Sequence, residues 1–108
     1  MDVAIKYQSF AQGLMDVVVI YTTDPQLAAF DDLVVLEDDL NFFPSYEFHP
    51  IIRRDTLEQF PEIETALSVL WGQVSNEDMI RFNYMVYSGQ ADLEGAATAF
   101  INYFRLLG

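Results

Sequence analysis

Two short apolar runs in the first half of the chain limit what it can fold into. Residues 16–21, DVVVIY, are rich in β-branched side chains, and residues 33–37, LVVLE, repeat the pattern. Continuous runs of this length are typical of strands buried on both faces. Residues 48–53 predict a third strand, with Pro50 near its start or at a sheet edge. Because a short helix is expected between the first two runs, we expect α/β layering with a few-stranded sheet.

Helix-start signals surround these runs. Residues 2–12 predict a helix that ends with Gly13 in the left-handed conformation. Asp24 followed by Pro25 predicts an N-cap and the first residue of a short helix through Phe30. Asp55 with Glu58 resembles a capping box, and further helices are predicted to start at Pro61, Ser75 and Asp92. The sequence therefore predicts three strands followed by a helical second half.

Composition excludes several classes of function. The 108 residues suit one compact domain or a piece of a larger one. A net charge of −12, from 17 acids against 5 Lys plus Arg, argues against binding nucleic acid or an anionic membrane surface. The absence of cysteine excludes disulfides and thiolate chemistry. No signal peptide is visible, and we interpret Met1 as an added start on a fragment of a longer chain.

Catalytic motifs are weak. The acidic run Glu37–Asp39 follows a predicted strand, but a catalytic pair needs a carboxyl group whose environment shifts its pKa. A solvated turn is the simpler interpretation, and a small acidic enzyme remains a lesser alternative. His49 is the only histidine and has no metal-ligand spacing, so we expect a structural role. No cofactor and no metal are implied.

The aromatic residues fall into two groups. Six lie at helical spacing and predict core positions: Tyr7, Phe10, Phe60, Phe82, Phe100 and Phe104. Four others lie at a predicted strand end or in a turn beside proline: Tyr21, Phe42, Phe43 and Tyr46. Aromatic faces gathered in a cleft can hold a quaternary ammonium by cation–π attraction, and packing in a hinge is the alternative.

Four blocks in order, IYTTD, LVVLEDD, FFPSY and HPIIR, resemble the C-terminal part of substrate-binding proteins from glycine betaine/choline ABC importers. The helical tail, TLEQFPEIETALSVLWGQVSNEDMIRFNYMVYSGQ, is similar to that of the family, including the pair Asn83-Tyr84. The resemblance covers about residues 3–104. The chain departs from the family pattern at Ile20 (usually glycine), at Ser45 (usually proline) and by one extra residue near Asp31-Asp32.

The resemblance implies a fold and a binding site. The fold would be the C-terminal fragment of a two-lobed periplasmic binding protein of type II, with residues 1–40 ending the second lobe. Residues 41–108 would contain the crossover and the C-terminal part of the first lobe. Tyr21 and Tyr46 would form part of an aromatic box around a trimethylammonium group. Thr22, Thr23 and Asp24 would line the same cleft edge.

The same resemblance implies partners and a location. The ligand would be glycine betaine, choline, carnitine or a similar methylated amine, and the other partners would be an ABC permease and the missing upstream half of the receptor. The protein would act outside the cytoplasm, in the periplasm or at the outer face of the membrane. Exposed sheet edges would favour a homodimer. The alternative is a ligand-free oligomerising structural or interaction domain that uses Trp71 and the Phe100/Phe104 stripe.

Overall fold

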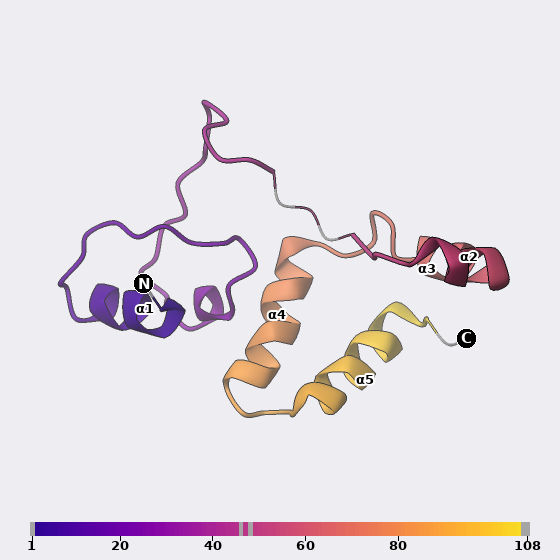
Figure 1. Ribbon diagram of the computed structural model, residues 1–108. Coiled ribbons are helices and arrows are strands. Elements are labelled where there is room, and N and C mark those ends of the chain that lie inside the picture. The colour runs from indigo at the N-terminus through magenta and orange to yellow at the C-terminus, as the bar shows by residue number, and fades with distance from the viewer. Residues whose placement is uncertain (1, 46, 48, 107–108) are drawn as a thin grey trace. The chain divides into compact units, whose positions relative to one another are not determined.

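The computed structural model describes residues 2–45, 47 and 49–106, which form helices joined by irregular segments (Figure 1). The chain divides into two compact units. The first contains the residues up to Asp31 and those from Ser75 onward, and the second runs from Asp32 to Val74. Among the described residues, no helix is long and apolar enough to cross a membrane.

The predicted α/β fold with a sheet is wrong: the described residues contain no strand. Residues 16–20 and 33–37 are irregular, and their side chains are largely open to solvent, with Val17 70% and Val34 80% exposed. An extended segment becomes a strand only when a neighbouring segment pairs with its backbone N–H and C=O groups. The third strand, predicted over residues 48–53, is also absent from residues 49–53, and Phe48 lies outside the described residues.

The first unit contains four helical elements, three of which begin at a side-chain cap. α1 (Val3–Ala11) begins where the Asp2 carboxylate accepts from Ala4 N at 2.8 Å, and Gly13 follows it with φ +71°. η1 (Pro25–Ala28) is a 3₁₀ turn with proline at its first position. These two elements confirm the predicted helix starts at Asp2 and Pro25, but Asp24 makes no capping bond to η1.

The two C-terminal helices of this unit also begin at their predicted caps. α4 (Asn76–Tyr87) opens with a capping box between Ser75 and Asp78, whose hydrogen bonds from Ser75 hold the pKa of the Asp78 carboxyl below its usual value. α5 (Leu93–Phe104) opens with the Asp92 carboxylate accepting from Gly95 N at 2.8 Å. The local chemistry of these caps was sufficient to predict both helices.

Aromatic side chains form the core of the first unit. Phe82 of α4 is buried, and its ring contacts the rings of Phe100, Tyr103 and Phe104 at centroid separations of 5.2, 5.8 and 6.4 Å. Tyr7 of α1 is buried and stacks on Phe30 with centroids 6.0 Å apart. The Phe100/Phe104 stripe, proposed above as a subunit interface, therefore packs against α4 within the chain.

The second unit contains two short helices and a turn in which the Asp38 carboxylate accepts Phe42 N and Phe43 N. α2 (Arg54–Gln59) contacts α3 (Glu62–Ser68), which starts directly after Pro61 as predicted. The capping box expected at Asp55 is absent, because Arg53 occupies the N-cap and Asp55 lies in the first turn. A partly open apolar pocket of about 170 Å³ is lined by Pro50, Ile52, Leu57, Ile63, Glu64, Leu67 and Trp71.

We predict that Phe82→Ala lowers the free energy of unfolding by about 3–5 kcal/mol, because it empties the centre of the aromatic cluster between α4 and α5. Chemical denaturation followed by far-UV circular dichroism measures the change. Leu93→Ala is the control, because Leu93 is largely exposed on α5. Similar losses in the two variants would show that Phe82 is not central to the core.

Candidate functional site

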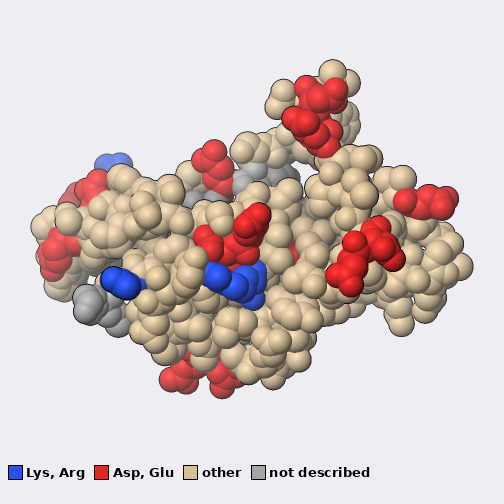
Figure 2. Space-filling view, turned by 180° about the vertical axis from the view of Figure 1, so that it is seen from behind, with Lys and Arg blue, Asp and Glu red and all other residues tan. Residues whose placement is uncertain are grey.

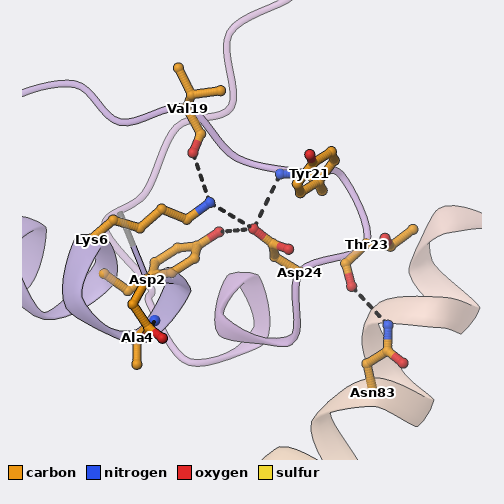
Figure 3. A network of polar contacts seen from close by, with 9 residues as sticks. Asp2, Ala4, Lys6, Val19, Tyr21, Thr23, Asp24 and Asn83 are labelled. Carbon is orange, nitrogen blue, oxygen red and sulfur yellow. Dashed lines mark hydrogen bonds and ion pairs between the residues drawn. The ribbon is translucent and has the colours of Figure 1, made fainter. Parts of the chain in front are cut away.

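The predicted ligand-binding segment, residues 21–24, is organised by the carboxylate of Asp24. Asp24 is only 9% exposed, and its Oδ2 accepts the backbone N–H of Tyr21 at 3.1 Å. The same oxygen accepts the hydroxyl of Tyr7 at 2.8 Å (Figure 3). These bonds close a tight loop between residue 21 and η1. A carboxylate this deeply buried needs such partners, because burial without them penalises its charge.

Lys6 supplies the compensating positive charge. Its Nζ lies 3.4 Å from Asp24 Oδ2 and donates to the carbonyl of Val19 at 2.9 Å (Figure 3). The same atom lies 5.2 Å from the centroid of the Tyr7 ring and 5.8 Å from that of Tyr21, both within cation–π range. The Lys6 side chain is only 13% exposed. One ammonium is thus surrounded by two tyrosine rings, a carboxylate and a carbonyl.

The environment of Tyr7 favours its neutral form. Burial raises the pKa of the Tyr7 hydroxyl well above its ordinary value, and the hydrogen bond to Asp24 raises it further. The phenol therefore stays protonated and keeps donating to Asp24 at physiological pH. Tyr7 was assigned to the core from its helical spacing, and its burial confirms this, but the role of its hydroxyl was missed.

Helix α4 contacts the segment from the other side. Asn83 Nδ2 donates to the carbonyl of Thr23 at 3.0 Å (Figure 3). Asn76 Nδ2 donates to Thr22 Oγ1 at 3.2 Å. These contacts join residues separated by 60 and 54 positions in the chain. The loop that carries the predicted site is therefore fixed to both α1 and α4.

The predicted site residues differ in their exposure to solvent. Tyr21 is 56% exposed, Thr22 is exposed, Thr23 is half-buried and Asp24 is buried. Tyr46 lies outside the described residues, so its pairing with Tyr21 stays a prediction. Sequence reasoning missed Lys6 entirely. The sequence marks Lys6 only as the single lysine of the chain, beside a core tyrosine, and no local pattern indicates its contact with Asp24.

The other candidate groups, the acidic run Glu37–Asp39 and His49, are exposed. Glu37, Asp38 and Asp39 are exposed, and the Asp38 carboxylate accepts Phe42 N and Phe43 N, both at 2.9 Å, within a turn. His49 is exposed, and its Nε2 lies 3.3 Å from Glu47 Oε2. Across the described ranges, no cluster of three or more His, Cys, Asp or Glu side chains could hold a metal ion.

The charge distribution agrees with the composition. Acidic side chains occur in several groups over the face shown in Figure 2, whereas basic side chains are few. A basic stripe of the kind that binds nucleic acid is not present on that face. A positively charged ligand would meet an attractive field near such a surface.

We predict that Tyr7 makes the stability of the protein fall at alkaline pH. Its pKa is raised in the folded state, so its contribution is complete below the ordinary tyrosine value near 10 and is lost as pH rises above it. Tyr7→Phe should lower the free energy of unfolding at pH 7 by about 1–2 kcal/mol, since it leaves the buried Asp24 one donor short. It should also flatten the alkaline decline.

Urea denaturation at several values between pH 7 and pH 11 tests both effects. Tyr84→Phe is the control, because Tyr84 belongs to the same first unit but is not a partner of Asp24 in the network of Figure 3. An alkaline decline of equal steepness in Tyr7→Phe and the unchanged protein would contradict the assignment.

Known proteins resemble this chain over most of its length. The family model described as the substrate-binding domain of ABC-type glycine betaine transport systems (OpuAC) matches residues 1–103. The ergothioneine transport permease/ergothioneine binding protein EgtU of Helicobacter pylori is 35% identical over 86 residues, which are 80% of this chain and 15% of that protein. No solved structure matches the chain significantly.

Two further relatives are binding proteins by name. The carnitine transport binding protein OpuCC of Listeria monocytogenes is 32% identical over 84 residues, covering 78% of this chain and 27% of the relative. A glycine-betaine-binding protein of Pseudomonas aeruginosa is 28% identical over 107 residues, covering 99% of this chain and 34% of the relative. The chain thus spans about a third or less of the length of these relatives. The matched family consists of binding proteins and not of enzymes. This chain belongs to that family, the substrate-binding domains of ABC-type glycine betaine transport systems.

Proposed function

We propose that this chain is part of the solute-binding component of an ABC importer for quaternary ammonium osmoprotectants and acts outside the cytoplasm. Family membership supports the transport role. The relatives are named for glycine betaine, carnitine and ergothioneine. These three compounds share a trimethylammonium group and a carboxylate, so the proposed ligand is a methylated amine of this kind. An ABC permease is the corresponding partner.

The observation that carries the proposal is the position of Tyr21 beside Asp24. The backbone N–H of Tyr21 binds the buried carboxylate, while more than half of the residue is exposed. A quaternary ammonium has no N–H to donate, so a protein holds it by aromatic faces and by negative charge close by. Tyr21 supplies an aromatic face, and Asp24 supplies a negative charge that is already paired with Lys6. The loop is also fixed by α1 and α4, which reduces the entropy lost on binding.

The rest of the proposed cage comes from elsewhere. Tyr46 would supply a second aromatic face, and Thr22 and Thr23 would line the edge of the cleft. In this proposal residues 1–40 end one lobe, residues 41–108 belong to the crossover and the other lobe, and the upstream half of the receptor supplies the remaining aromatics. Ligand binding would close the two lobes, and the closed form would be the one that the permease recognises.

A calorimetric titration with choline, glycine betaine and carnitine tests this function. We would titrate the 108-residue chain and the same chain joined to the upstream part of its receptor. Saturable binding by the longer protein supports the proposal, and binding by the short chain as well would place enough of the cage within it. The absence of binding by both proteins would contradict it.

We predict that Tyr21→Ala weakens binding of choline or glycine betaine by the receptor by about 1–2 kcal/mol, the usual value of a desolvated cation–π contact. Tyr46→Ala should have a similar effect. Tyr87→Ala is the matched control, because Tyr87 is 55% exposed on α4, almost the same as Tyr21. Unchanged affinity in both site variants would exclude these two tyrosines from the cage.

A second candidate, a ligand-free oligomerising domain, is favoured by the large exposed apolar side chains of the irregular segments. They include Leu14, Val17, Val19, Val34 and Leu36. Exposed apolar side chains mark a contact with another protein chain where they form one patch. Analytical ultracentrifugation distinguishes the two functions: a stable dimer whose thermal stability is unaffected by every methylated amine favours the second.

A further inference from the structure

The ammonium of Lys6 is held in the way that a protein holds a foreign cation. Two ring centroids lie 5.2 and 5.8 Å from Nζ, a carboxylate oxygen lies at 3.4 Å, and a backbone carbonyl accepts at 2.9 Å. Surface lysines normally keep their heads in water, whereas this side chain is 87% covered by the protein, being only 13% exposed. The same cluster contains Tyr21 and Asp24, two of the residues proposed above to meet the ligand.

We propose that Lys6 is an internal competitor that weakens the binding of external cations at this site and so sets the threshold for their capture. The inference rests on the proposed function, because it assumes that the ligand cation approaches Tyr21 and Asp24. In the ligand-free chain, the lysine neutralises Asp24 and occupies one side of the two tyrosine rings. An arriving cation must either displace the ammonium or bind beside it.

Both routes carry a cost for the ligand. Displacement breaks the hydrogen bond from Nζ to Val19 and the ion pair with Asp24, and a quaternary ammonium cannot replace that hydrogen bond. Binding beside Lys6 places two positive charges a few ångströms apart, which is unfavourable at any protein dielectric. A lysine that serves only the fold would impose neither cost, so the affinity for cations separates the two roles.

A different role for Lys6 predicts the opposite result. Glycine betaine carries a carboxylate, and a lysine that binds this carboxylate would strengthen its binding. Tetramethylammonium has no carboxylate and reports only on the cation site. Titrating both compounds therefore distinguishes an internal competitor from a carboxylate-binding residue.

The test is an NMR titration of the 108-residue chain with tetramethylammonium chloride and with glycine betaine, following the ring resonances of Tyr7 and Tyr21. The variants are Lys6→Met, which keeps the length of the side chain without its charge, and Arg54→Met. The second variant is the charge-matched control, because Arg54 is an exposed cation in the other unit. Removing Lys6 should tighten the binding of both compounds about fivefold or more, and removing Arg54 should change it less than twofold.

Each outcome decides the question. Equal affinities in Lys6→Met and the unchanged protein, or no cation-induced shift at Tyr21 in Lys6→Met, would overturn the proposal. Weaker binding of glycine betaine alone would assign Lys6 to the ligand carboxylate and would also overturn it. The proposed function is judged separately, by calorimetry on the longer receptor and its Tyr21→Ala variant, so either idea can fail without the other.

A second measurement needs no variant and applies even if Lys6→Met is unstable. Lys6 is the only lysine, so reductive methylation with ¹³C-formaldehyde labels only this amine and the N-terminus. The covered ammonium should react slowly in the unchanged protein. Saturating tetramethylammonium should speed its modification severalfold if the cation displaces it, with the N-terminal amine as the internal control. A rate that is fast from the start would overturn the proposal, because Lys6 would then not be held. A rate that added cation leaves unchanged while Tyr21 shifts would support the other route, in which the cation binds beside Lys6.

Discussion

One buried carboxylate determines how the first unit is assembled. Asp24 Oδ2 accepts from the Tyr7 hydroxyl, from Tyr21 N and from the Lys6 ammonium, so a single atom fixes α1, the approach to η1 and the start of η1 relative to one another. Asn83 then joins the neighbouring Thr23 carbonyl to α4. Because a buried charge without partners is strongly destabilising, these contacts depend on one another and should be lost together. The predicted binding loop is therefore also a structural joint.

This double use changes the role that Asp24 can play toward a ligand. A free carboxylate beside an aromatic face would attract a cation directly, whereas this one already has a paired ammonium and two hydrogen-bond donors. The pair is nearly neutral at a distance, so the attraction left for a ligand comes mainly from ring faces and from the surrounding acidic surface. Burial keeps the pKa of Tyr7 raised, so the phenol keeps its proton and its hydrogen bond to Asp24 near neutral pH.

The helix starts could be predicted because their signals are local. Asp2, Ser75 and Asp92 each cap the helix that follows within three residues, and no distant partner is required. The absence of strands could not be predicted. The pattern in residues 16–21 and 33–37 indicates a preference for burial and extended backbone, but a strand also needs a paired neighbour, which the described residues do not provide. Tyr21 and Asp24 were predicted as site residues from the resemblance, but their link to Lys6 spans up to 18 positions and has no local signature.

The charge of the chain and the placement of its lysine act at different distances. A net charge of −12 raises the concentration of every cation near the surface, but this attraction is screened within about 8 Å at physiological salt and does not distinguish one cation from another. In the proposed site, discrimination between cations would arise at the exposed ring of Tyr21, where the Lys6 ammonium already lies within cation–π range. Small cations are strongly hydrated, so the free-energy cost of losing water outweighs their attraction to aromatic faces. A methylated ammonium is weakly hydrated and gains most from the rings, so it is the class best able to overcome an internal competitor.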